Sequence, residues 1–314
     1  MTPDVIAVGN ANVDIIMYVD KIPGEDEAIE AQDAVISAGG SAANYAVALS
    51  RLNVRSGFIG RIGKDNFGDF IKNEFIREKV DISRLKVDNK HPTGKVFIIV
   101  TKDGSRRMIA YRGANAYVSK NDLDGSYISK AKILHAASIR KKLAEDIAEM
   151  ILKYNVAFSY DPGSVVCKYG LKGFLNILKH VKILYLNLRE LECLTGSKDP
   201  ESAFQLLRYG PRIVVVKMGS KGSYIVFSDA RIRVPPYKPK QVVDTTGAGD
   251  VFAAALTASL LKGYNLWDSA LFASIAAGIK VSRKGARNGI PYEHEIVTVF
   301  NKLREKLSKG LILT

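Results

Sequence analysis

Cysteine is nearly absent from this sequence, with only Cys167 and Cys193 among 314 residues. Neither lies in a C-x-x-C pair, and the four histidines, at positions 91, 135, 180 and 294, are isolated, so the spacing of a zinc site is missing. A disulfide-rich secreted scaffold is also excluded by so few cysteines. We expect two free thiols in a reducing cytoplasm.

A targeting segment and a P-loop are also missing. The amino terminus reads MTPDVIAVGN, without a basic stretch or a long apolar run, and is typical of a first β-strand. We therefore expect a cytoplasmic protein without a membrane partner. No G-x-x-x-x-G-K-[ST] pattern occurs, since Gly60–Asp65 lacks both its spacing and its hydroxyl. Any phosphate site must be built in another way.

Acidic residues are too few to balance the basic ones, and the formal net charge is +14. The lysines and arginines are scattered, and the densest runs, Arg106-Arg107 and Arg140-Lys141-Lys142, are short. A nucleic-acid site would need clustered basic residues with interleaved aromatics, so we expect no nucleic-acid partner. A positive field would still attract a polyphosphate substrate.

Hydrophobic residues make up 47% of the chain, which is enough for one large core, and no linker or repeat divides it. We expect a single domain over residues 1–314. Short apolar strands alternate with helical stretches in its middle part, which favours an α/β fold whose mostly parallel sheet is covered by helices on both faces. The expected strands are 5–8, 56–59, 133–136, 157–160, 183–186 and 213–216, and the expected helices are 41–52, 67–79, 143–154, 171–180, 251–262, 266–281 and 292–307.

Two β excursions, near residues 12–36 and 93–112, fit neither layer of such a sheet. They turn at Pro23-Gly24 and Asp103-Gly104, which are favoured turn pairs. We interpret them as a small lid over the site, and as a candidate surface for pairing two subunits.

The run Asp244-Thr245-Thr246-Gly247-Ala248-Gly249-Asp250 carries the strongest chemical signal, because an apolar helix follows it at once. The amides of Gly247, Ala248, Gly249 and Asp250 would face out of a helix N-terminus, where the partial positive charge binds phosphate. Asp250 could then accept a hydroxyl proton. A glycine loop with an aspartate N-cap would have the same sequence pattern. Two acids around the glycines favour the functional interpretation, since a cap needs only one.

These residues resemble the second signature of the PfkB family of carbohydrate kinases, and Gly39-Gly40-Ser41-Ala42-Ala43-Asn44 resembles the first. The resemblance runs from Gly9 to about Pro291. It implies a ribokinase-like three-layer αβα fold and transfer of phosphate from ATP, with Mg²⁺, to an alcohol of a sugar or nucleoside.

The resemblance also assigns site residues. Asp250 becomes the catalytic base, with the amides of Gly247, Ala248 and Gly249 stabilising the transferred group. The acceptor would be held by Asn12, Asp14, Gly40, Asn44 and Asp250. Taken alone, Asn12 and Asp14 would equally indicate turn chemistry at the end of a strand.

Nucleotide and metal contacts follow from three further segments. Asn187-Leu188-Arg189-Glu190 resembles an N-x-x-E element that holds Mg²⁺ largely through water. A helix start with glutamate in its first turn is the alternative. The remaining nucleotide contacts are Lys217, Gly219, Ser220 and Gly222, together with Gly249 and Ser274. A strand followed by a hairpin turn would explain residues 217–222 equally well.

The stretch Ser282–Ala286 resembles the monovalent-cation loop of ribokinases. The resemblance implies a K⁺ site formed by Asp244 and Thr246 together with the backbone carbonyls of Lys280, Arg283 and Gly285. Potassium activation is therefore a hypothesis.

The sequence leaves the identity of the acceptor open. Bacterial ribokinases usually carry lysine where Ser41 stands and an acidic sugar contact in the region of residues 138–142, which here reads Ser-Ile-Arg-Lys-Lys. A smaller Ser41 leaves room for a nucleoside such as cytidine, inosine or adenosine. Arg107, Arg112 and Arg140 suit an acidic or phosphorylated sugar such as ketodeoxygluconate or ribose 1-phosphate. A non-catalytic nucleotide-binding regulator is a further alternative, and the presence of Asp250 speaks against it.

Overall fold

A nine-stranded sheet forms the centre of the molecule. The computed structural model describes residues 2–103 and 105–308. Within them the strand order is β13-β12-β11-β10-β9-β8-β1-β4-β5. All neighbours from β5 to β11 are parallel, and β12 and β13 continue the sheet in antiparallel fashion. The strands are β1 (Val5–Gly9), β4 (Ser56–Gly63), β5 (Asp81–Asp88), β8 (Ile133–Ala137), β9 (Ala157–Asp161), β10 (Val181–Asn187), β11 (Ile213–Lys217), β12 (Ser223–Phe227) and β13 (Ala230–Val234).

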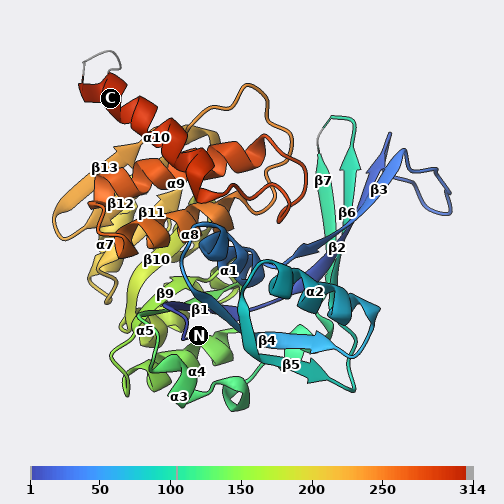
Figure 1. Ribbon diagram of the computed structural model, residues 1–314, viewed down its shortest axis with the longest axis horizontal. Coiled ribbons are helices and arrows are strands. Elements are labelled where there is room, and N and C mark those ends of the chain that lie inside the picture. Colours follow the sequence, from blue (N-terminus) through green and yellow to red (C-terminus); the bar gives the residue numbers. More distant parts are fainter. Residues whose placement is uncertain (1, 104, 309–314) are drawn as a thin grey trace.

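Helices cover both faces of this sheet, as Figure 1 shows. Alternate residues of β1 enter different cores: Val5 and Ala7 belong to one apolar cluster, Ile6 and Val8 to the other. The first cluster is completed by α1 (Ser41–Arg51), α2 (Asn66–Arg77), α8 (Ala248–Leu261), α9 (Leu266–Val281) and α10 (Glu293–Ser308). The second is completed by α3 (Gly125–Ile128), α4 (Lys141–Ile151), α5 (Val165–Leu178), α6 (Leu188–Thr195) and α7 (Phe204–Leu207). The predicted α/β architecture with three layers is confirmed.

A second, four-stranded sheet stands to one side of this body in Figure 1. Its order is β3-β2-β6-β7, with β2 and β6 parallel and the outer pairs antiparallel. The strands are β2 (Asn12–Val19), β3 (Asp33–Gly39), β6 (Gly94–Thr101) and β7 (Arg106–Tyr111). We call it the small sheet. Gly104 of the expected turn lies outside the described residues. Because β2 begins directly after β1, the base of the small sheet lies at the carboxyl edge of the large one.

Three strands of the large sheet, β5, β12 and β13, were not among the expected elements. The outermost two, β5 (DISRLKVD) and β13 (ARIRV), carry charged residues along their length. Charges are common on edge strands because they discourage pairing with other chains, and they hide the apolar alternation that marks a strand. Helix α5 also begins earlier than expected, at Val165, and is interrupted at Gly170, whose φ is 60°.

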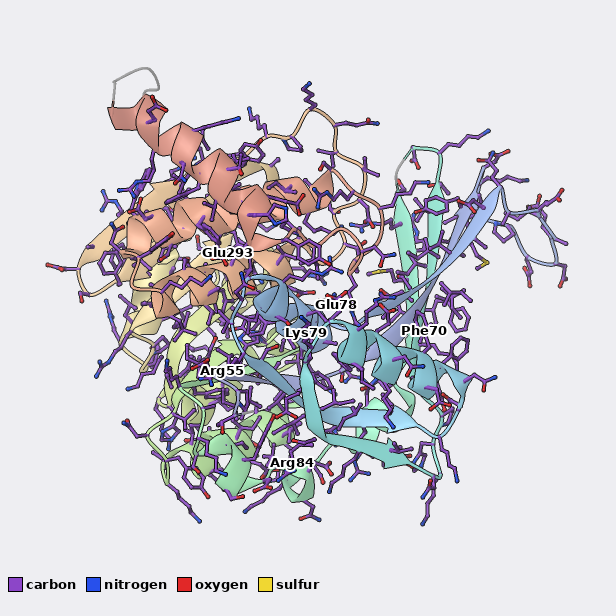
Figure 2. The ribbon with its side chains drawn as sticks, viewed as in Figure 1. Arg55, Phe70, Glu78, Lys79, Arg84 and Glu293 are labelled. Atoms are coloured by element: carbon purple, nitrogen blue, oxygen red, sulfur yellow. A yellow bond between two sulfur atoms is a disulfide. The ribbon has the colours of Figure 1, made fainter. Side chains whose placement is uncertain are left out.

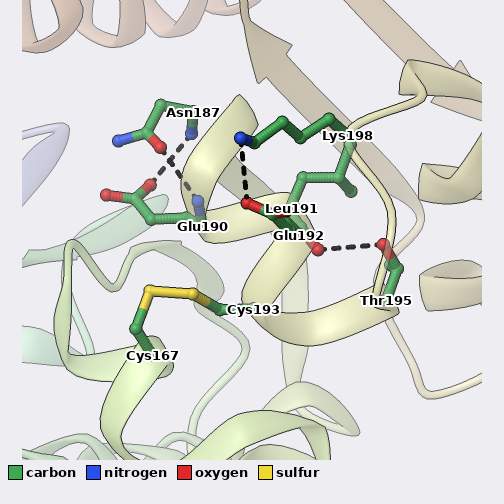
Figure 3. Close-up of a disulfide and its surroundings, with 8 residues drawn as sticks. All are labelled: Cys167, Asn187, Glu190, Leu191, Glu192, Cys193, Thr195 and Lys198. Carbon is green, nitrogen blue, oxygen red and sulfur yellow. Dashed lines mark hydrogen bonds and ion pairs between the residues drawn. A yellow bond between two sulfur atoms is a disulfide. The ribbon is translucent and has the colours of Figure 1, made fainter.

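The prediction of two free thiols is wrong, because Cys167 and Cys193 form a disulfide. Figure 3 shows the bridge between α5 and α6. Their Cα atoms are 4.9 Å apart although 26 residues separate them in sequence. Helices packed side by side bring them together, which spacing along the chain does not reveal. The cysteines therefore give no argument for a reducing compartment.

Helix α1 is fixed at its C-terminal end by a buried ion pair. Arg51 donates through Nε and Nη2 to the two carboxylate oxygens of Glu78, at 2.9 and 2.7 Å, and through Nη1 to the carbonyl oxygen of Ile290 at 2.6 Å. In Figure 2, Glu78 lies where α1 and α2 meet. These bonds connect α1 to the segment that follows α9.

Among the described residues, no helix has the length and apolarity needed to cross a membrane.

Candidate active site

The N-terminus of α8 is an open set of backbone donors. Gly247 is its N-cap, with a φ of 77°, and among the described residues no side chain caps the helix. A Cβ on Gly247 would lie 3.2 Å from the carbonyl oxygen of Ala286, and one on Gly249 would lie 3.3 Å from Nζ of Lys217. The first turn of α8 therefore lies close to the backbone of Ala286 at Gly247 and faces the ammonium group of Lys217 at Gly249. An anion placed there would meet backbone N–H groups and a cation.

Asp250 lies in the first turn of α8 and does not cap the helix, so the N-cap alternative is wrong. Its Oδ2 accepts a hydrogen bond from Nδ2 of Asn44 at 3.0 Å, which joins the two sequence signatures across 206 residues. Burial raises the pKa of Asp250 to about 6, against the effects of the Asn44 hydrogen bond and the Lys217 charge. A carboxylate with a pKa near neutrality suits a general base.

Two strand ends and the first turn of α6 supply the charges around Asp250. Lys217, at the end of β11, forms an ion pair with Asp161, at the end of β9. Burial lowers the pKa of Lys217, but the carboxylates of Asp161 and Glu190 outweigh it and raise the pKa above its ordinary value. Asp161 directly follows the expected strand 157–160, but the sequence assigned it no role. Its position at the carboxyl end of a parallel strand was the signal that could have identified it.

Asn187 and Glu190 form a reciprocal capping box at the start of α6. The backbone N–H of Asn187 donates to Oε2 of Glu190 and that of Glu190 to Oδ1 of Asn187, both at 2.9 Å (Figure 3). The helix-start alternative is thus correct for the local geometry. Burial and the nearby Asp161 charge raise the pKa of Glu190, and Lys217 opposes them.

The same acids fit a magnesium ion. The charge of Asp161 helps to raise the pKa of Glu190, and a nearby cation would relieve this repulsion between the two carboxylates. Mg²⁺ is usually held by one or two carboxylates, with water and phosphate completing its shell. Within the described residues, no cluster of three or more histidine, cysteine or acidic side chains is arranged to hold a metal.

On the side of the small sheet, Asn12 is held by a residue that the sequence did not identify. Asn115 donates from Nδ2 to Oδ1 of Asn12 at 2.8 Å and to the carbonyl oxygen of Ala11 at 3.1 Å. It also accepts from the backbone N–H of Ala11 at 3.1 Å. This buried amide fixes the start of β2, and no local pattern could reveal a partner 103 residues away.

Asp14 lies next to the glycines of the first signature. A Cβ on Gly39 would stand 2.2 Å from Oδ2 of Asp14, and one on Gly40, where φ is 98°, only 2.3 Å from the carbonyl oxygen of Asn10. Both positions therefore require glycine. Burial raises the pKa of Asp14 to about 7, although the charge of Arg287 opposes it.

Several polar atoms of this region lack a partner within the described residues. Ser37, the cross-strand neighbour of Asp14, has an unbonded Oγ, and Asn44 an unbonded Oδ1. Nε and Nη1 of Arg287 are also unbonded, while its Nη2 donates to the carbonyl oxygen of Gly39 at 3.2 Å. Buried polar atoms are normally satisfied, so this group indicates a place for a polar ligand or for ordered water.

The loop after β11 contains both a tight and an open glycine. Gly222, with φ 84°, would place a Cβ 2.1 Å from the carbonyl oxygen of Val234, whereas Gly219, with φ 59°, has free space before it and Ser220 is exposed. Ser274 accepts from the backbone N–H of Tyr237 at 3.0 Å and donates to the carbonyl oxygen of Pro235 at 2.8 Å. Its hydroxyl is thus used to hold the 235–237 segment, and a part in adenine binding stays a prediction.

Three of the residues assigned to a monovalent-cation loop contact Asp244, namely Thr246, Lys280 and Gly285. Oδ1 of Asp244 accepts from the backbone N–H of Thr246 at 2.9 Å and its Oδ2 from that of Gly285 at 3.0 Å. Arg283 pairs with Glu295 outside this ring of contacts. Nζ of Lys280 donates to the carbonyl oxygen of Asp244 at 2.7 Å, so a side-chain cation already occupies this loop.

The family model for pfkB family carbohydrate kinases matches residues 2–293. The chain belongs to this family. Its large sheet, flanking helices and small sheet form a ribokinase-like fold. The matched range contains both signatures, which the Asn44–Asp250 hydrogen bond brings into contact.

Individual relatives differ in the acceptor that their names give. An ATP-dependent ribose-1-phosphate kinase of Halopiger xanaduensis is 30% identical, over 90% of this chain and 94% of its own. A bifunctional ribokinase/ribose-5-phosphate isomerase A of Fructilactobacillus sanfranciscensis is 29% identical, and this chain spans 56% of its length. The Arabidopsis thaliana ribokinase, solved with ribose and ATP, superposes with a TM-score of 0.85 at 29% identity, covering 96% of this chain and 99% of that one. Other relatives are named nucleoside kinase and 5-dehydro-2-deoxygluconokinase.

Proposed function

We propose that this protein transfers the γ-phosphoryl group of ATP to an alcohol of a sugar or nucleoside, with Asp250 as the catalytic base. One observation carries the proposal. Asp250 is hydrogen-bonded to Asn44 of the first signature, and it lies beside an uncapped helix N-terminus that faces Lys217. An alcohol, a base and a cradle for a phosphoryl group can therefore meet at one point.

The acceptor would lie between the small sheet and α1. Asn12, Asp14 and Asn44 offer both hydrogen-bond donors and acceptors to hydroxyl groups, and the backbone at Gly40 lets the ligand approach closely. The unbonded atoms of Ser37, Asn44 and Arg287 become satisfied when polar groups enter. Asp250 then removes the proton of the attacking hydroxyl while Asn44 holds its carboxylate in place.

The triphosphate would lie along the strand ends. The amides of Gly247 to Asp250 and the ammonium of Lys217 balance charge on the transferred group. Asn187 and Glu190, together with Asp161, would hold a magnesium ion mainly through water, and such an ion neutralises phosphate charge and aligns the oxygens. Gly219, Ser220 and Gly222 would border the nucleoside.

The small sheet would act as a lid that excludes water from the reacting groups. Two hydrogen bonds already connect it to the loop before α8: Arg106 of β7 donates to Oγ1 of Thr246 at 2.6 Å and to Oγ1 of Thr245 at 2.8 Å. Met108 and Ile109 on the same strand are 61% and 69% exposed. Exposed apolar side chains on an edge strand suit pairing of two subunits, so a homodimer through the small sheet stays a prediction.

A screen of acceptors tests the proposal. Purified protein with Mg²⁺ and ATP should release ADP only when an acceptor is present, across ribose, fructose, ketodeoxygluconate, cytidine, inosine, adenosine and ribose 1-phosphate. The phosphorylated product should be identified by mass, and the same acceptor should be inactive with Asp250→Asn. Nucleotide binding with no acceptor-dependent ADP release from this panel or from related polyols would favour the non-catalytic regulator.

A further inference from the structure

Lys280 is a lysine buried completely inside the protein, with a relative exposure of 0%. It lies near the end of α9, and its Nζ donates to the carbonyl oxygen of Asp244 at 2.7 Å and stands 3.8 Å from Oδ2 of the same residue. Lysine is almost never fully buried unless its charge is paired. This lysine therefore has a specific electrostatic partner, the residue that opens the second signature.

The carboxylate of Asp244 is satisfied without a metal ion. Each of its oxygens accepts one backbone N–H, from Thr246 and Gly285. Lys280 lies on the Oδ2 side, and Arg106 lies on the other side with its Nη1 3.7 Å from Oδ1. Two side-chain cations thus flank one anion.

These contacts conflict with the K⁺ site that the sequence implied. That site required the carboxylate of Asp244 and backbone carbonyls of the two loops. A metal cation bound there would be placed within a few ångströms of the Lys280 ammonium, and like charges at such a distance repel strongly away from bulk water. The residues present do not fit a monovalent metal ion unless Lys280 first leaves its buried position.

We propose that the ammonium group of Lys280 is the resident cation of these loops, so that this kinase works without a monovalent metal ion. The proposal rests on the proposed function only for its activity assay. Lys280 links α9 to the loop that leads into α8, and Ala286, which lies just beyond Gly285, packs against Gly247. The cation therefore stabilises the shape of the loops that position the backbone donors of α8.

The charge state of Lys280 agrees with this role. Burial lowers its pKa to about 8; Asp244 and Asp250 act to raise it, and Arg106 acts to lower it further. At neutral pH the group is mostly an ammonium, because the solution pH lies below that pKa.

The first experiment compares salts. Turnover of the wild-type enzyme should change less than about twofold among KCl, NaCl and tetramethylammonium chloride at equal ionic strength, since it carries its own cation. Activation of several-fold by K⁺ over tetramethylammonium would overturn the proposal.

Two substitutions then separate charge from space. Lys280→Ala removes both the charge and the volume of the side chain. Its turnover in tetramethylammonium chloride should fall at least about tenfold, which is the scale of one lost electrostatic contact near a reacting group. Its turnover should recover in KCl, because K⁺ can then enter the vacated space. Lys280→Met removes the charge and keeps the volume, so it should be impaired in every salt. Lys302→Ala, an exposed lysine on α10, is the control and should behave as wild type. Full activity of Lys280→Ala in tetramethylammonium would contradict the proposal.

Thermal unfolding gives a readout that does not depend on turnover. For Lys280→Ala, KCl should raise the unfolding midpoint by at least about 2 °C over tetramethylammonium chloride, as expected for a ligand that binds only the folded state. The wild-type midpoint should be the same in both salts. Should no acceptor be phosphorylated, the kinase proposal fails while this comparison still decides the role of Lys280. Should Lys280→Ala not fold, the wild-type midpoint decides alone, and a K⁺-dependent rise would refute the proposal.

Discussion

The two halves of the site differ in how their polar groups are satisfied. The strand-end cluster, which comprises Asp161, Glu190, Lys217 and Asp250, consists of charges that pair with one another or with nearby amides. The small-sheet cluster, which comprises Asn12, Asp14, Ser37 and Asn44, contains buried atoms that lack a partner within the described residues. The first is electrostatically arranged before any ligand arrives. Under the proposed function, the acceptor would complete the second cluster, and selectivity for the acceptor would come from there.

Among the changes that separate the two clusters, removal of the Lys217 ammonium group should have the largest effect. Lys217→Met takes away the cation that faces Gly249 and leaves Asp161 without its ion-pair partner. We expect kcat/KM to fall by about 10²–10³, the scale of a lost contact to developing charge. The affinity for ATP should fall as well, measured by titration calorimetry. Lys221→Met, an exposed lysine in the same loop, is the matched control, and equal losses in the two variants would remove Lys217 from this role.

A change in the small-sheet cluster should act on the acceptor alone. Asp14→Asn replaces a charged hydrogen-bond acceptor, so kcat/KM for the acceptor should drop by about 10–100-fold while the dissociation constant of ATP stays the same. Asp33→Asn, at the exposed far end of β3, provides a control. Loss of ATP affinity in Asp14→Asn would show that the two clusters are not separate.

The pH profile should also separate the two clusters. The pKa of Asp250 is about 6 and that of Asp14 about 7, and each carboxyl must be ionised to act as base or acceptor. Acceptor kcat/KM should therefore rise with pH through this range and level off above it. In Asp14→Asn the step near pH 7 should disappear while the step near pH 6 remains. A single unchanged profile in both enzymes would contradict the assignment of these carboxyls.

The smallest expected effect is on stability. The pKa of Asp250 is raised from 3.8 to about 6, so the unfolded chain ionises first as pH rises, and folding loses free energy between those values. Asp250→Asn should recover about 1–3 kcal/mol of unfolding free energy at pH 8 and almost none at pH 4. Denaturant unfolding measures this, with Asp229→Asn in an exposed turn as the control. A loss of stability of Asp250→Asn at pH 8 would show that the ionised Asp250 carboxylate does not destabilise the fold.

The strand ends of the first cluster could be placed from the sequence pattern, whereas the small-sheet cluster rested on the resemblance alone, and the reason is physical. Parallel strands that alternate with helices end at one edge of the sheet. Asp161, Asn187 and Lys217 each follow one of the expected strands 157–160, 183–186 and 213–216 directly, so their proximity follows from periodicity alone. The buried strands of the large sheet were also predicted well, because strands covered on both faces are continuously apolar. The charged edge strands β5 and β13 do not have that pattern and were missed.

Contacts between distant segments could not be predicted. Asn115 and Asn12, or Asn44 and Asp250, are far apart in sequence, and only the second pair was suggested by the resemblance of two signatures. The disulfide between Cys167 and Cys193 depends on how α5 packs against α6. The side chain of Lys280 was likewise overlooked, since the resemblance drew attention to its backbone carbonyl.

The central claim is that Asp250 removes the proton of the acceptor hydroxyl, and turnover of Asp250→Asn tests it most directly. With the acceptor identified by the screen, kcat should fall by about 10²–10⁴, the usual contribution of a general base, while the dissociation constant of MgATP stays within about threefold of the wild-type value. A variant that keeps wild-type turnover, or that loses activity only because it no longer binds MgATP, would contradict the claim.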